Sequence, residues 1–507
     1  MIPKENTSST GGESLLQVVW LKRDIRIYDH APIVEATRTG PTLIIYILEP
    51  SIWQAKDMSK RHLAFVVESL RSLEHDVRKR GGFILYAVSE MEPVLESIFQ
   101  QYGPFRLLAH EEYGTPWTFE RDKKVHRWMR LRGLSFVEYQ HFGVTRRLRS
   151  RQQFNHLWRR YIEADVLQPP ERFVMGDKIP TRLSTSMQSF ANLDINGDWV
   201  DANLGQKGGE REAHRQLKKF LSGTYADYLK SISSPFLAEK NCSRLSPYLA
   251  WGNISLRYVV QQSESVLDNG VERWAQKSML AYLSRCHWHC HFIQRIEDQP
   301  DIAIRTLNPA FDKVRVDWNE EWFQKWASGT TGVPLIDAGM RALHQTGWVN
   351  FRMRAILVSF VCNTLLLDWR KPAEHLARLF IDYEPGIHYS QVQMQAGVTG
   401  FNTIRIYNPY KQAEDHDPDE RFIRKYIPEW DGPSTYIQPI IDVEQANRVA
   451  RDILWGIKKN SETRTISKKL LARHGSRKKA SVVQMEFELD GIKGLPLEQS
   501  LQYNKDS

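Results

Sequence analysis

Short apolar runs alternate with longer amphipathic stretches in the first third of the chain. Leu63 to Val77 repeats apolar residues at i, i+3, i+4 and i+7, the spacing of a buried helix face, and Gly81-Gly82 ends this helix. The runs that resemble strands are Val18–Leu21, Thr42–Leu48, Phe83–Val88, Arg106–Ala109 and Ser135–Glu138. Because strands alternate with helices, the pattern predicts an α/β domain with a parallel, doubly wound sheet over residues 15–142.

The pattern becomes helical after residue 210, and the next β-rich run is Thr403–Tyr407. We therefore expect an all-α domain over residues 211–455, large enough to enclose a cofactor between its helices. The clearest helical segments are Ala213–Leu221, Pro247–Ala250, Trp274–Ile296, Trp322–Ala327, Leu335–Thr346 and Arg352–Asp368.

Three segments lie outside these domains. Residues 1–14 are polar, and we expect them to be disordered. Residues 143–210 contain the basic stretch TRRLRSRQQF and several prolines, which predicts an interdomain linker with local helices. Residues 456–507 form a basic tail that we expect to be flexible and to attract phosphates non-specifically.

Composition narrows the class of protein. The formal net charge of +9 favours a polyanionic partner such as nucleic acid. The four cysteines contain no Cys-x-x-Cys pair, which fits a reducing compartment. No apolar run has transmembrane length, and the N-terminus lacks the apolar core of a signal peptide. We expect a soluble, intracellular monomer without a membrane partner, located in the cytoplasm, the nucleus or an organelle.

The segment from Asp382 to Pro409 has a high density of polar side chains that could serve a functional site. It combines carboxylates at Asp382 and Glu384 with His388 and several amides, directly after a helical block. Polar side chains at this density beside apolar helices line a cavity for a large polar ligand. The alternative is a surface loop whose polar residues cap helices.

Two further stretches carry candidate chemistry. In CSRLSPYLAWGNIS, Ser243 and Ser246 can cap a helix and leave backbone N–H groups for an anion. The helix LSRCHWHCHFIQRIE spaces two cysteines and two histidines four residues apart, which suits either a metal or ordinary buried packing. The spaced pairs are Cys286 with Cys290 and His287 with His291.

Arginines also stand beside tryptophans between residues 326 and 370. Trp348, Arg352, Arg354 and Trp369 lie among good helix formers. Arginine next to tryptophan can bind phosphate and stack on a base. The same residues are equally consistent with core tryptophans covered by arginine stems.

Taken in order, these segments resemble the DNA photolyase/cryptochrome family. The matching motifs are WLKRDIRIYDH, SRLSPYLAWGNIS, GTTGVPLIDAGMRAL, GW, LLLDWR and RIYNP, within residues 17 to about 430. The resemblance implies an N-terminal α/β domain and a helical domain that holds FAD in a U shape. Many members carry a second, antenna chromophore of folate or flavin/deazaflavin type. Family repair enzymes use blue light and reduced flavin to split pyrimidine dimers in DNA, whereas cryptochromes use similar photochemistry for signalling.

The resemblance also implies a set of flavin-binding residues. Cys242 replaces the usual threonine of the phosphate-binding turn, His289 replaces an arginine near the cofactor, and Glu384 replaces an aspartate near the ring. Arg354 and Asp382 match a buried pair beside the flavin. The full implied set is Tyr228, Cys242, Ser243, Arg244, Leu245, Ser246, His289, Arg354, Asp382, Glu384 and His388.

Two departures concern electron transfer. His388 stands where repair enzymes have an asparagine facing the flavin N5, so it is expected to tune the redox state that accumulates. Val392 replaces the innermost tryptophan of the family's electron-transfer chain, although Trp369 and Trp318 match the outer two. Tyr389 and Trp348 are candidates for another route.

Other departures concern the substrate and the antenna. Trp288 matches a tryptophan that packs on the flipped dimer and Arg352 supports a DNA-facing surface, but Arg285 replaces a glutamate that hydrogen-bonds the dimer. Ala355 replaces a methionine there, and Asn350, Phe351 and Ala355 lack the histidines of the animal-type (6-4) enzymes. HEEYGTPWTFERD resembles the antenna-side segment, with His110, Glu111 and Glu112 as candidates. Cys362 is the last cysteine, which argues against an iron–sulfur cluster near the C-terminus.

We therefore expect a photolyase-type lyase that uses FAD and blue light to repair pyrimidine photoproducts in DNA. The alternative is a cryptochrome-type photoreceptor with little repair activity. A metal-dependent nucleic-acid-binding protein built on the Cys/His helix is a third, weaker hypothesis, and no metal is assigned.

Overall fold

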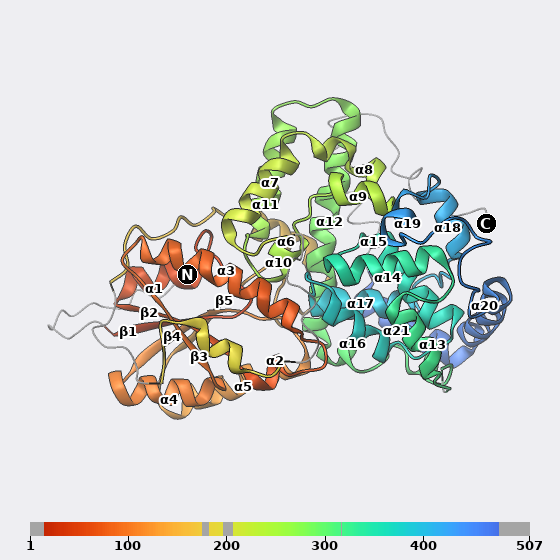
Figure 1. Cartoon of the computed structure of the whole chain (residues 1–507). Coiled ribbons are helices and arrows are strands. Elements are labelled where there is room, and N and C mark those ends of the chain that lie inside the picture. The colour runs from red at the N-terminus through yellow and green to blue at the C-terminus, as the bar shows by residue number, and fades with distance from the viewer. Residues whose placement is uncertain (1–14, 175–181, 196–205, 316, 476–507) are drawn as a thin grey trace.

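The computed structural model describes residues 15–174, 182–195, 206–315 and 317–475. The expectations for residues 1–14 and for the end of the tail lie outside the described residues. Figure 1 shows an α/β unit on one side of the molecule and a larger helical unit on the other.

The N-terminal unit is a five-stranded parallel sheet of order β3-β2-β1-β4-β5, which confirms the predicted fold class. Val19 lies at its centre, opposite Ile44 on one side and Leu108 on the other. The strands are β1 (Leu16–Leu21), β2 (Thr42–Leu48), β3 (Ile84–Val88), β4 (Phe105–His110) and β5 (Phe136–Tyr139).

Both faces of the sheet are covered, as the continuous apolar strands require. Val18 and Trp20 face helices α4 (Met91–Tyr102) and α5 (Pro116–Leu131), in a core that this unit shares only with Leu183 of the connecting segment. Val19 and Leu21 face the opposite side, where the core is continuous with that of the helical unit. Helices α1 (Ala31–Thr39) and α3 (Lys60–Arg78) cover this second face.

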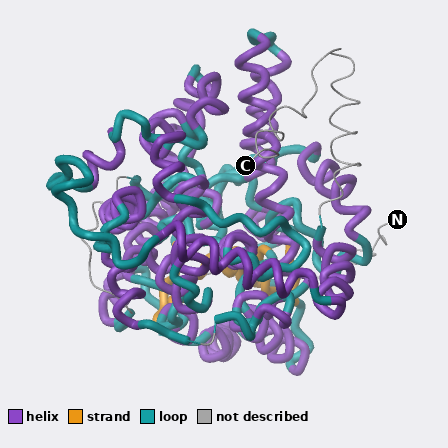
Figure 2. The backbone as a smooth tube through the Cα atoms, turned by 90° about the vertical axis from the view of Figure 1, so that its right-hand side faces the viewer, coloured by secondary structure: helices purple, strands orange, loops and turns teal. Residues whose placement is uncertain are grey.

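The helical unit lies in front of the strands when the molecule is viewed from its right-hand side (Figure 2). Its longest helix is α12 (Arg273–Asp298), and the C-terminal part of α15 (Phe351–Ser359) continues as one π-helical turn, Phe360–Thr364. The remaining α-helices, including short ones from the first unit and the connection, are α2 (Pro50–Trp53), α6 (Phe154–Glu163), α7 (Glu210–Leu221), α8 (Tyr228–Ser231), α9 (Pro235–Asn241), α10 (Ser246–Ala250), α11 (Leu256–Asp268), α13 (Glu320–Ser328), α14 (Pro334–Thr346), α16 (Arg370–Leu379), α17 (Pro385–Gln395), α18 (Pro409–His416), α19 (Arg421–Tyr426), α20 (Val443–Lys459) and α21 (Ser461–His474).

Two local expectations are wrong. Thr403–Tyr407 has no regular secondary structure and pairs with no strand among the described residues; Tyr407 N instead donates to Ser359 Oγ at 3.2 Å. The start of the supposedly flexible tail is helical: α20 continues to Lys459 and α21 follows. Asn308 holds α21 through Ser467 Oγ, a tertiary contact that the local basic sequence does not reveal.

The carboxyl end of β1 joins the two units. Arg23 Nε donates to Ala250 O at 3.0 Å, and Arg26 Nη1 donates to Gly252 O at 3.1 Å. Gly252 has φ +67, and a Cβ there would lie 2.2 Å from Arg23 O. Only glycine allows this approach without displacing the backbone, so the turn after α10 fixes how the units meet. Within the described part of the chain, no helix combines the length and apolarity that a membrane span needs.

Candidate functional site

A large cavity opens in the helical unit, with a volume of about 870 Å³. Its walls come mainly from α10, α12, α15, α17 and the turn before α10. The structure brings together on this cavity all the residues expected to bind flavin: Tyr228, Cys242, Ser243, Arg244, Leu245, Ser246, His289, Arg354, Asp382, Glu384 and His388.

The turn between α9 and α10 supplies the most polar part of one wall. Arg244 adopts a left-handed conformation with φ +54, which costs a non-glycine residue about 1–3 kcal/mol and occurs preferentially at functional turns. Its guanidinium stacks on Trp348, 3.8 Å from the ring centroid, and donates to Gln206 Oε1 at 2.7 and 3.0 Å. Trp348 in turn donates to Ser246 Oγ at 3.2 Å.

The proposed capping role of the serines in this turn is wrong. Leu245 is the N-cap of α10 and makes no side-chain cap bond, while Ser243 Oγ accepts the N–H of Leu245 at 3.4 Å. Ser246 lies inside the helix. The two hydroxyls therefore line the cavity instead of capping the helix.

Arg354 and Asp382 form the charged pair expected from the sequence. Arg354 Nη2 donates to both carboxylate oxygens, at 2.7 and 3.0 Å, and Arg354 Nε donates to Val349 O at 2.9 Å. The Asp382 side chain is 3 % exposed and the Arg354 side chain 28 %, so the carboxylate is buried and the guanidinium faces the cavity. The pair holds the start of the 382–409 segment against α15.

Burial disfavours the charged forms of Glu384 and His388. Burial raises the pKa of Glu384 to about 7, against the opposing charge of Arg23 at 3.9 Å. Burial lowers the pKa of His388 to about 4. His388 Nε2 lies 2.9 Å from Ala373 O, and because a carbonyl only accepts, Nε2 carries the proton and Nδ1 is left as an acceptor.

Gln391 and Gln395 are cavity residues that the sequence reasoning missed. They follow His388 at i+3 and i+7 on α17, so the three side chains share one face of a buried helix. Gln391 Oε1 and both amide atoms of Gln395 are buried without a hydrogen-bond partner among the described residues. Buried polar atoms are normally satisfied, so this stripe indicates a polar ligand. The sequence signal that could have revealed Gln391 and Gln395 is their spacing of three and seven residues from His388, which places polar side chains on one face of a helix.

The three expected substrate residues also line the cavity. Trp288 is half-buried on α12, with its ring 5.1 Å from His291 and 5.5 Å from Phe292. Arg285 is exposed, with its guanidinium 5.9 Å from the Phe351 ring. Arg352 Nε is buried without a hydrogen-bond partner in the described chain. The mixture of aromatic faces and cations suits a nucleotide.

Trp369, Trp318 and Tyr389, three of the predicted electron-transfer residues, do not line the cavity. Trp369 is buried and donates to Thr306 Oγ1 at 3.0 Å, and Trp318 donates to Glu320 Oε2 at 2.6 Å. Tyr389 is buried and donates to Asp57 Oδ2 at 3.4 Å, an oxygen that also accepts from Tyr383. Of the candidates for another route, only Trp348 lines the cavity.

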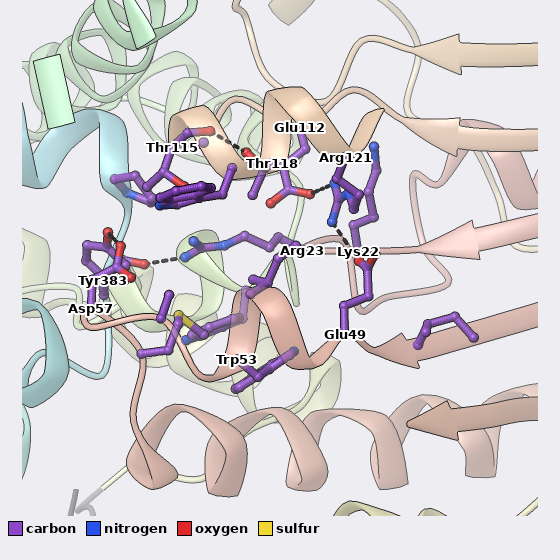
Figure 3. Close-up of a pocket in the computed structure, with 18 of the residues that line it drawn as sticks. Lys22, Arg23, Glu49, Trp53, Asp57, Glu112, Thr115, Thr118, Arg121 and Tyr383 are labelled. Carbon is purple, nitrogen blue, oxygen red and sulfur yellow. Dashed lines mark hydrogen bonds and ion pairs between the residues drawn. The ribbon is translucent and has the colours of Figure 1, made fainter. Parts of the chain in front are cut away.

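A second, much smaller cavity of about 60 Å³ lies at the carboxyl ends of the strands (Figure 3). Of the antenna candidates only Glu112 lines it, beside Arg121, which also pairs with Glu49 at 3.0 Å. His110 instead donates from Nδ1 to buried Asp24 at 2.8 Å, and Glu111 accepts from Tyr113 at 2.5 Å. The three residues therefore do not meet on this cavity, and their grouping as one antenna site stays a prediction.

Within the described residues, the Cys/His helix contributes to no cluster of potential metal ligands. His287 Nε2 hydrogen-bonds Asn155 Oδ1 at 3.0 Å, and Cys286 and Cys290 are buried. Over the residues that the structure describes, Asp24, His30 and His110 form the one group with metal-ligand geometry. Its atoms are engaged with each other, because Asp24 Oδ2 accepts from both histidines at 2.9 and 2.8 Å.

Comparison with known proteins identifies the class. Residues 17–145 match the DNA photolyase family model, and residues 282–458 match the FAD binding domain of DNA photolyase. The chain belongs to the DNA photolyase/cryptochrome family, as its sequence predicted.

Among curated relatives, a deoxyribodipyrimidine photo-lyase of Thermus thermophilus is 29 % identical over 87 % of this chain and 99 % of its own. One of Agrobacterium fabrum is 27 % identical over 81 % and 87 %. A class III photolyase structure from Agrobacterium tumefaciens shares the fold at 24 % identity, with a TM-score of 0.78 over 90 % of this chain and all of its own. A Synechocystis cryptochrome shares it at 20 % identity, with a TM-score of 0.77 over 88 % and 100 %.

Proposed function

We propose that this protein is a FAD-dependent, light-driven lyase that repairs pyrimidine photoproducts in DNA. The observation that carries the proposal is the single large cavity on which the expected flavin residues and the expected substrate residues meet. The names of the curated relatives support repair over signalling.

The residues present fit FAD. A volume of about 870 Å³ lies within the ~300–1,000 Å³ typical of ligand pockets. Arg244, Ser243 and Ser246 supply a cation and hydroxyls suited to a diphosphate, and the unpartnered amides of Gln391 and Gln395 suit the polar edge of a ring system. When bound, FAD supplies a light-excitable one-electron donor.

The chain's own residues then have definite roles. Arg354 donates two hydrogen bonds to Asp382. This pair fixes the start of the 382–409 segment beside the cavity. His388 remains neutral at physiological pH because its pKa is about 4, so it offers an acceptor at Nδ1 and no acid.

Trp288 and the cations around it suit a base that has left the DNA stack. Extruding a base costs a few kcal/mol, and stacking on an aromatic side chain returns about 1–3 kcal/mol. The net charge of +9 adds attraction to the phosphate backbone. A second chromophore remains a prediction, and the protein is proposed to act as a monomer.

Light-dependent repair tests the proposal directly. Oligonucleotides with one cyclobutane dimer or one (6-4) product, single- or double-stranded, are incubated with the protein in blue light and in the dark. We expect light-dependent restoration of at least one lesion. Trp288→Ala should weaken damaged-DNA binding about 5- to 150-fold, from the stacking energy. Trp274→Ala, which changes a 47 % exposed tryptophan on the same helix, is the control. Failure on every substrate refutes repair and leaves the photoreceptor alternative.

A further inference from the structure

One end of the large cavity contains a buried arginine with no matching acid. Arg295 lies on α12 two turns beyond Trp288 and is 2 % exposed. Its Nε and Nη1 atoms have no hydrogen-bond partner among the described residues. Instead its guanidinium lies 5.4 Å from the ring of Phe292 and 5.7 Å from that of Phe401.

A second buried arginine, Arg151, also has side-chain N–H groups without hydrogen-bond partners among the described residues. Arg151 has a side chain that is 6 % exposed, and its Nε and Nη1 are also without hydrogen-bond partners within the described chain. It is held by a hydrogen bond from Nη2 to His291 O at 3.1 Å. Burial and the charge of Arg151 lower the pKa of Arg295 to about 9, so Arg295 is still charged at neutral pH.

The nearby acid does not balance these charges. Asp298 lies 3.7 Å from Arg151 Nε and accepts from Gln294 at 2.9 Å, and its own pKa is raised by burial. His474, at the end of α21, donates from Nε2 to Gln299 Oε1 at 3.0 Å and supplies no negative charge to balance the arginines. Buried cations are normally paired, because an unpaired one costs several kcal/mol.

We propose that Arg295, supported by Arg151, forms a binding site for a phosphoryl group at the α21 end of the cavity. The flanking aromatic rings favour a phosphodiester that arrives attached to a base, because Trp288, Phe292 and Phe401 offer stacking faces along the same wall. A guanidinium with free N–H groups binds phosphate in a planar, bidentate manner. In its nucleic-acid form the inference rests on the proposed function, and it adds a phosphate contact to the expected substrate residues.

The test neutralises phosphates one at a time. Single-stranded oligonucleotides with one cyclobutane dimer carry a methylphosphonate at each linkage around the lesion, and their binding in the dark is measured by fluorescence anisotropy. For the wild type we expect one linkage whose neutralisation weakens binding about 10-fold or more. Arg295→Met should show weaker binding overall and no further loss at that linkage. Arg451→Met, which changes an exposed arginine of α20, should behave as the wild type.

A second arm distinguishes a free anion from the strand. Inorganic phosphate is titrated while the unfolding temperature is measured, with chloride at matched ionic strength. If no linkage is coupled to Arg295 but phosphate stabilises the wild type and Arg451→Met and not Arg295→Met, the ligand is free phosphate. If neither arm depends on Arg295, the proposed site is wrong.

A charge-conserving variant and measurements without light keep the test decisive. Arg295→Lys retains the charge and loses the bidentate fork, so it should give an intermediate loss; it also replaces Arg295→Met if that variant does not fold. Because both arms measure binding without light, they give an answer even if the protein repairs no lesion.

Discussion

The Arg354–Asp382 pair gives the most direct structural prediction. Replacing Arg354 with methionine retains much of the side-chain volume but removes two charge-assisted hydrogen bonds, at 2.7 and 3.0 Å, from a carboxylate that is 3 % exposed. Breaking a buried pair costs about 3–5 kcal/mol. Arg354 is 28 % exposed toward the cavity, where water can partly replace it, so we expect a loss of about 2–3 kcal/mol.

The control is an exposed ion pair of the same domain. Arg424 and Glu420 are 2.8 Å apart, with side chains 54 % and 35 % exposed, so Arg424→Met should cost about 0.5 kcal/mol or less. Both variants are compared with the wild type by guanidinium unfolding, followed by tryptophan fluorescence, together with the flavin content of the purified proteins. Equal losses in the two variants would show that burial of Asp382 does not determine the energy.

Three further predictions concern the cavity floor and the junction of the two units. His388→Asn should change which flavin redox state accumulates in blue light, since it replaces a neutral acceptor whose pKa is about 4; identical absorption spectra during illumination would remove this role. Gly252→Ala should lower the unfolding temperature more than Gly270→Ala, because both glycines have positive φ, +67 and +79, but only at Gly252 would a Cβ meet backbone, 2.2 Å from Arg23 O. Similar shifts in the two variants would mean that the junction tolerates the added atom. Burial raises the pKa of Glu384 from 4.5 to about 7. The contribution of Glu384 to the free energy of unfolding is therefore complete below pH about 4.5 and is lost as the pH rises through 7. The stability of the wild type relative to Glu384→Gln should therefore fall between pH 5 and 8, by on the order of 2–3 kcal/mol in denaturant titrations, and a pH-independent difference would contradict the raised pKa.

The sequence allowed the sheet to be predicted because each strand is a short β-rich run bounded by a turn. Thr42–Leu48 has the same bounds in the prediction and in the structure. The run Thr403–Tyr407 was misjudged because extended sequence forms a strand only where a partner edge exists, and here its backbone bonds Ser359 instead.

The residues of the cavity could be predicted where the sequence matches the family, and not elsewhere. Arg354 and Asp382 are 28 residues apart, and only the resemblance brought them together before the structure did. Arg295 lies outside the matched motifs, and its lack of a partner depends on the packing of η1 (Arg151–Gln153), α12 and α21, which no local pattern encodes. The hydrogen bond from His110 to Asp24 is equally invisible in the local sequence, because Asp24 follows a different strand.

Flavin stoichiometry tests the central claim most directly. The cavity of about 870 Å³ and its donor set predict a yellow protein that releases one FAD per chain on acid denaturation, or that takes up one FAD when reconstituted. In Arg354→Met the bound fraction should fall. A correctly folded protein that stays colourless after incubation with FAD would contradict the assignment of the cavity, and with it the proposed light-driven repair.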